Sequence, residues 1–170
     1  TISYARYNSR LIACQNNMRE LGTAFMQFSE TKCGYLVEIP RCGNLSFNGC
    51  YAAILKDSGL VTDDRLFSCA GIGADAPPVY IPSVKTIMAA SGEQLCHLKR
   101  SMGHFGYTMG YCDEDGGYCP PQNKRRANVV LLADMPSLNT AGRVSANHGG
   151  WGQNCLFEDG HVGFVRGDSI

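Results

Sequence analysis

Two aspartates and two histidines in the last third of the chain could together bind a divalent cation. Asp134 and His148 lie near the ends of predicted strands, and Asp159 and His161 flank a predicted turn. Imidazole nitrogens and carboxylates bind zinc and similar ions, and carboxylates with loop carbonyls hold calcium. The sequence therefore makes these four residues a candidate cation site, and it implies no other cofactor.

Simpler roles for the same residues are the favoured interpretation. Asp159 can serve its own turn, His148 can hydrogen-bond a neighbouring loop, and His161 can face solvent. Catalysis is not indicated, because the chain has no Gly-x-Ser-x-Gly elbow and no phosphate-binding glycine loop with a lysine. Ser145 lies near His148 but lacks the third group and the oxyanion pocket that a triad needs. We therefore expect a protein that is not an enzyme.

The nine cysteines are dispersed, and none forms the Cys-x-x-Cys pair of a zinc knuckle or a thioredoxin site. This pattern predicts structural disulfides and hence export to an oxidising compartment, outside the cell or on its surface. An odd total leaves at least one cysteine free or joined to another chain. We expect local disulfide clamps among Cys33, Cys42 and Cys50, and between Cys112 and Cys119.

The overall composition excludes some partners. The 170 residues carry 15 basic and 15 acidic side chains, so the chain has no net charge to attract nucleic acid or anionic lipid. No apolar stretch reaches the ~20 residues needed to span a bilayer. The first residues resemble the middle of a helix, so we expect that an upstream segment has been removed.

A long helix is expected over about residues 3–29, because apolar residues recur there every three or four positions. This stripe could form a coiled-coil seam, but packing onto a sheet is favoured since no flanking charge pattern stands out. The helix should bury these positions: Tyr4, Tyr7, Leu11, Cys14, Met18, Leu21, Phe25 and Phe28.

The rest of the chain predicts an α+β fold in one domain over residues 1–170. A spine helix (1–30) precedes a loop-rich middle (31–125) with a short helix near 50–58, and a β-rich part (126–170) follows. Short apolar runs at 128–133, 155–157 and 162–165 predict strands, and Asp159-Gly160 is typical of a hairpin turn.

Three stretches together resemble a known family, the bacterial prepilin-type proteins, which are similar to type IV pilins and to the pseudopilins of type II secretion. The stretches are CQNNMRELG at 14–22, LFSC at 66–69 and NHGGWGQNCLFEDGHV at 147–162. The family's C-terminal box is a histidine, about nine residues, then Asp-Gly. Here ten residues separate His148 from Asp159, and the family's N-terminal anchor helix is absent from the sequence.

The resemblance implies a pilin-like body, with the spine helix packed on a C-terminal antiparallel sheet and with disulfide-stapled loops. It implies a structural subunit of a cell-surface or extracellular filament or tube that assembles with copies of itself, and that meets a membrane only through the missing anchor. It also implies a Cys14–Cys69 disulfide, because both residues lie within the family motifs. The alternatives are a minor pseudopilin of a secretion system and a secreted metal- or ligand-binding module using the His/Asp cluster.

Overall fold

The first element is a helix that runs through the whole predicted spine. The computed structural model describes residues 2–72, 78–136 and 145–167, and helix α1 spans Ile2–Thr31. Its 30 residues make it about 45 Å long. It ends where Gly34 takes a left-handed conformation and donates its N–H to the Ser29 carbonyl at 2.8 Å. The predicted helix is therefore confirmed.

The middle of the chain holds more regular structure than the predicted loop-rich segment. Helix α2 (Cys50–Asp57) confirms the short helix expected near 50–58. Two further helices, α3 (Val84–Ala89) and α4 (Gly92–Ser101), lie in the part that was expected to be rich in loops, and Ser83 caps α3 by accepting a hydrogen bond from the Thr86 N–H at 3.1 Å. The elements are α2 (Cys50–Asp57), the 3-10 helix η1 (Asp64–Phe67), α3 (Val84–Ala89), α4 (Gly92–Ser101) and the small ribbon of β2 (Tyr111–Cys112) and β3 (Tyr118–Cys119).

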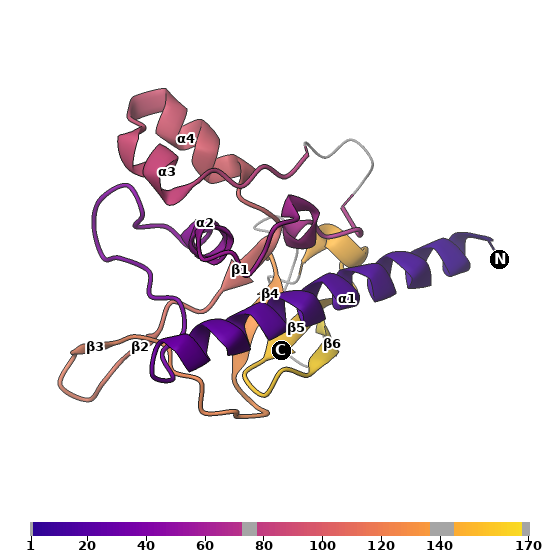
Figure 1. Cartoon of the computed structure of the whole chain (residues 1–170). Helices are drawn as coiled ribbons and strands as arrows, with labels where there is room; N and C mark the ends of the chain where they lie inside the picture. Colours follow the sequence, from indigo (N-terminus) through magenta and orange to yellow (C-terminus); the bar gives the residue numbers. More distant parts are fainter. Residues whose placement is uncertain (1, 73–77, 137–144, 168–170) are drawn as a thin grey trace.

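An antiparallel sheet of four strands forms the second layer (Figure 1). The strands are β1 (Phe105–Tyr107), β4 (Val130–Asp134), β5 (Gly152–Phe157) and β6 (Val162–Arg166), in the spatial order β1-β4-β5-β6. The β5–β6 hairpin turns at Asp159-Gly160, as expected. The α+β class is confirmed, while residues 137–144 and 168–170 of the predicted β-rich part lie outside the described residues.

Helix α1 packs directly on β5 and β6. Met18, Leu21 and Phe25 are fully buried in this contact region. Gly22 permits the close approach, because a Cβ atom there would lie 2.9 Å from Leu156 Cδ1. Farther along, Phe25 stacks on Tyr107 of β1 with ring centroids 5.1 Å apart. One face of the helix thus supplies much of the core.

The first turns of α1 are an exception to the predicted buried stripe. Tyr4 is 68% exposed, and Tyr7 and Leu11 are only half-buried. This end of the helix extends past the sheet, so none of the strands in the described ranges covers it (Figure 1). The expectation that Tyr4 is a core residue is wrong. None of the helices in the described ranges is long and apolar enough to cross a membrane.

The expected disulfide staples are not present, since all nine cysteines lie in the described ranges and carry free thiols. Cys112 pairs with Tyr118 in the ribbon, and Cys119 pairs with Tyr111. Because neighbouring residues of a strand point to opposite faces, the two thiols do not meet. Cys33 and Cys42 are exposed, whereas Cys50 is buried in the core on α2, so these three do not form the expected clamps.

Candidate metal centre

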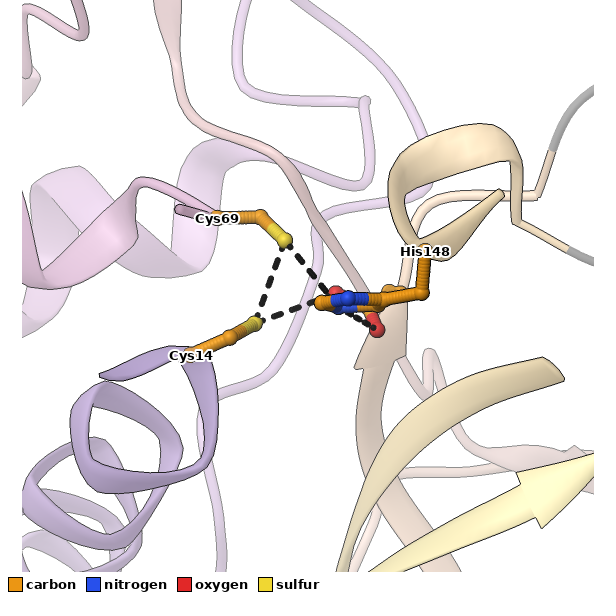
Figure 2. A group of neighbouring side chains, drawn as sticks. Cys14, Cys69 and His148 are labelled. Atoms are coloured by element: carbon orange, nitrogen blue, oxygen red, sulfur yellow. Dashed lines mark hydrogen bonds and ion pairs between the residues drawn. The ribbon is translucent and has the colours of Figure 1, made fainter. Parts of the chain in front are cut away.

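Four side chains from four separate segments converge in the core. Cys14 comes from α1, Cys69 follows η1, and Asp134 ends β4. His148 comes from the 3-10 helix η3 (Ala146–His148). All four residues are buried, and their potential ligand atoms lie within 4.8 Å of one another. Figure 2 shows the two sulfur atoms and the His148 ring pointing toward one another.

The individual distances are short. Cys14 Sγ lies 3.2 Å from Cys69 Sγ and 3.3 Å from Asp134 Oδ1. His148 Nε2 lies 3.4 Å from Cys69 Sγ and 3.1 Å from Asp134 Oδ2. Two sulfurs, one nitrogen and one carboxylate therefore surround a single point.

The residues that follow Cys14 hold α1 against the rest of the site. Asn17 Nδ2 donates to the carbonyl of Ser68 at 2.9 Å, directly before Cys69. Gln15 Nε2 donates to Asn154 Oδ1 at 3.1 Å, and Asn154 lies on β5. The CQNN stretch thus positions Cys14 through its amide side chains, which gives this motif a structural explanation.

Asn154 is the residue that orients the acidic side of the cluster. Its backbone N–H donates to Asp134 Oδ2 at 2.7 Å, and its Nδ2 donates to the same oxygen at 3.1 Å. The register of β4 and β5 places Ala133 opposite Cys155, so Asn154 lies beside Asp134. Asn154 was not predicted as a site residue, although it stands inside the C-terminal box.

Aromatic rings and a loop enclose His148. The rings of Tyr7 and Phe164 contact it edge-on, with centroids 6.4 and 6.1 Å away. Ser145 begins η3 by accepting the Asn147 N–H at 3.2 Å. The second ring nitrogen, Nδ1, is buried and has no hydrogen-bond partner among the described residues.

The cluster also shifts the pKa values of its members. The hydrogen bond from Cys14 lowers the pKa of Cys69 to about 6, and the same bond, with burial, raises the pKa of Cys14. Burial alone would lower the pKa of His148, but Asp134 and Cys69 outweigh it and raise that pKa to about 9. Burial likewise opposes ionisation of Asp134, yet His148 and Asn154 hold its pKa below the ordinary value. Cys69 is thus the sulfur that ionises first.

The arrangement differs from a nucleophile–base–acid triad. In a triad the two ring nitrogens of histidine contact different groups, one the nucleophile and one the carboxylate. Here Nε2 alone contacts both Cys69 and Asp134, while Nδ1 contacts neither. The geometry brings electron-pair donors together and suits cation binding or pairing of the two sulfurs.

The structure therefore brings together only two of the four residues that were predicted to bind a cation. Asp134 and His148 meet, but Asp159 and His161 form a separate pair at the β5–β6 turn, joined at 2.6 Å between Asp159 Oδ1 and His161 Nδ1. The His161 ring stacks on Phe157, which holds it at the turn, so it does not reach the core. The other two members of the cluster are Cys14 and Cys69, for which the resemblance to prepilin-type proteins implied a disulfide.

Glu158 is a second residue with a role that the sequence did not predict. It is almost completely buried and accepts hydrogen bonds from Arg126, at 3.0 Å from the backbone N–H and at 2.6 and 3.1 Å from the guanidinium. Burial alone would raise the pKa of Glu158, but the hydrogen bonds from Arg126 outweigh it and lower that pKa. This pair joins the chain before β4 to the end of β5.

Replacing Glu158 with glutamine should cost about 2 kcal/mol of unfolding free energy at neutral pH, because charge-assisted hydrogen bonds are lost. A lowered carboxyl pKa stabilises the fold above its unfolded value of about 4.3, and this contribution is lost as pH falls through the folded pKa. Urea unfolding of wild type and Glu158→Gln should therefore differ at pH 7 and converge in acid. The exposed Glu93→Gln on α4 is the control, and a gap that persists in acid would contradict the ion-pair explanation.

A scan against models of protein families, a search of curated proteins and a search of solved structures each found no match to this chain.

Proposed function

We propose that the protein is a structural subunit of a pilin-like filament or tube, outside the cell or on its surface, that assembles with copies of itself. The observation that carries this proposal is the shape of α1, a rigid helix that packs on the sheet at one end and extends past it at the other (Figure 1). The motifs shared with prepilin-type proteins support the same assignment.

Two apolar side chains in the N-terminal half of α1 are available to a neighbour. Tyr4 is 68% exposed and Ile12 is 55% exposed. Ile12 precedes Cys14 by two residues, which turns it roughly 200° around the helix from the buried face. An isoleucine held there by a rigid helix suits a contact with another subunit, since it loses little conformational freedom on binding.

The charge of the chain is compatible with self-association. Its basic and acidic residues balance, so copies carry no net charge that would drive them apart. Repetition of one heterologous contact between identical subunits generates a helical filament when the contact does not close into a ring. A helix that extends beyond its own body can supply one half of such a contact.

Negative-stain electron microscopy of the natural full-length protein tests the proposal. We expect regular filaments or tubes from wild type, and we expect Ile12→Glu to raise the concentration needed for assembly at least tenfold, because it places a charge in an apolar contact of about 2 kcal/mol. The matched control is Met88→Glu, which changes an apolar side chain that is 63% exposed on α3. Dispersed particles from wild type, with and without reductant, would count against a filament subunit and favour a minor pseudopilin.

A further inference from the structure

We propose that Cys14, Cys69, Asp134 and His148 form a zinc site that fastens α1 to the sheet. This inference does not depend on the proposed assembly, since it concerns the interior of a single chain. It rests on the convergence of four ligand atoms from four segments in a fully buried position.

The donor set suits zinc better than the other common ions. Two thiolates, one imidazole and one carboxylate are intermediate in softness and match the ligands of four-coordinate zinc sites. Calcium and magnesium prefer a shell made of oxygens, and this cluster offers oxygen from Asp134 alone.

The spacing also suits a tetrahedral ion. Zinc–sulfur bonds of about 2.3 Å and zinc–nitrogen or zinc–oxygen bonds of about 2.0 Å place neighbouring ligands roughly 3.3–3.8 Å apart. The observed separations are 3.2 Å between the sulfurs, 3.3 Å from Cys14 Sγ to Asp134 Oδ1 and 3.4 Å from Cys69 Sγ to His148 Nε2. These three separations are shorter than the tetrahedral values by up to about half an ångström, and all four ligand atoms lie within 4.8 Å of one another, so small side-chain shifts would admit the ion.

Outer contacts already orient the ligands. Both Asn154 donors contact Asp134 Oδ2, which leaves Oδ1 beside Cys14 Sγ for the ion. Asn154 Nδ2 also lies 2.9 Å from His148 Nε2, and zinc would replace that contact. The Gly71 N–H points at Cys69 Sγ from 3.4 Å and favours its thiolate. In known zinc sites, hydrogen bonds from residues outside the ligand set fix the orientation of the ligands in the same way. Binding requires both thiols to release their protons to solvent and His148 to bind through neutral Nε2.

A pocket of about 350 Å³ reaches His148, while Cys14, Cys69 and Asp134 are not part of its wall. Its wall includes His148, Asn147 and Gly71 on one side and Arg6, Tyr7 and Arg10 of α1 on the other. Zinc with two thiolates and one carboxylate carries a net charge of −1, which the two arginines complement.

The competing chemistry is a Cys14–Cys69 disulfide. It forms when both thiols lose their protons and pass two electrons to a thiol oxidant such as another disulfide. That bond removes two of the four zinc ligands, so the two outcomes exclude each other.

Metal analysis of the full chain, purified without chelator or reductant, decides between them. We expect about one zinc per chain, with Cys14 and Cys69 unreactive toward an alkylating agent until the zinc is removed. Cys69→Ala should lower the zinc affinity at least 100-fold, whereas Cys50→Ala, at an equally buried cysteine outside the cluster, should leave it unchanged.

Cobalt replacement in the wild type provides a readout that requires no variant to fold. The spectrum should show thiolate-to-cobalt charge-transfer bands and the intense visible bands of a tetrahedral ion. The proposal would be overturned if the purified chain contains no zinc and has a mass two hydrogens below that of the fully reduced chain. Such a chain would also yield a disulfide-linked peptide that contains Cys14 and Cys69. Zinc binding that survives Cys69→Ala unchanged would overturn it as well.

Discussion

Replacing Asp134 with alanine is expected to destabilise the metal-free protein by about 3–5 kcal/mol, the range found when one partner of a buried ion pair is removed. The substitution leaves the backbone N–H of Asn154 without its acceptor, removes one of the two partners of Asn154 Nδ2, and leaves His148 without its carboxylate. Each group is buried and cannot turn to water for a replacement. The unfolding free energy in urea, measured with EDTA present, reports this network separately from any bound ion.

Asp159 provides the control for Asp134. Both aspartates pair with a histidine, but the Asp159–His161 pair is largely exposed at a turn, with side-chain exposures of 30% and 48%. Exposed pairs contribute little, so Asp159→Ala should lower the unfolding free energy far less than Asp134→Ala does. If the two alanine variants lose equal unfolding free energy, burial of the Asp134 network does not determine how much it stabilises the protein.

Replacing Gly71 with alanine is expected to cost about 3 kcal/mol or more, which exceeds the usual loss from one added methyl group. The new Cβ atom would lie 2.2 Å from the Asn147 carbonyl oxygen and 2.7 Å from His148 Cε1. A backbone oxygen and a buried ring cannot both retreat without moving η3. Thermal unfolding should show a decrease in Tm of roughly 6–12 °C for a chain of this size.

Gly106 is the matched control for Gly71. It lies in β1, and a Cβ atom there would meet only the Ala133 carbonyl oxygen, at 4.0 Å. Gly106→Ala should therefore change the Tm by no more than a few degrees, because alanine fits the strand and restricts the unfolded chain. A Gly71→Ala protein as stable as Gly106→Ala would mean that the loop of His148 adapts more readily than its packing indicates.

The helix and the hairpin could be predicted because their signals are local. The three- and four-residue spacing from Cys14 to Phe28 reports a helix face directly, and Asp159-Gly160 sets the turn between two apolar runs. Tyr4 follows the same spacing, yet it is exposed. Periodicity identifies the side of a helix that faces the core, but it does not show where the underlying sheet ends.

The candidate site was harder to predict because its residues lie far apart in the sequence and come together only in the folded chain. Nothing local distinguishes Asp134, which is buried, from Asp159, which lies at the surface. Asn154 takes its role from the register of β4 and β5, which the order of residues does not reveal. The stretches that resemble prepilin-type proteins did suggest a Cys14–Cys69 pair, and the two sulfurs lie 3.2 Å apart. The resemblance could not distinguish a disulfide from two cysteines that bind the same ion.

The separation of the four clustered residues along the chain has a kinetic consequence. Contacts within the cluster join residues 55, 79 and 120 positions apart. Closing such long loops is slow, so these contacts are expected to form after the transition state for folding. Interactions that form late change the folding rate little and mainly slow unfolding. The non-covalent contacts of the cluster should therefore lengthen the lifetime of each folded molecule.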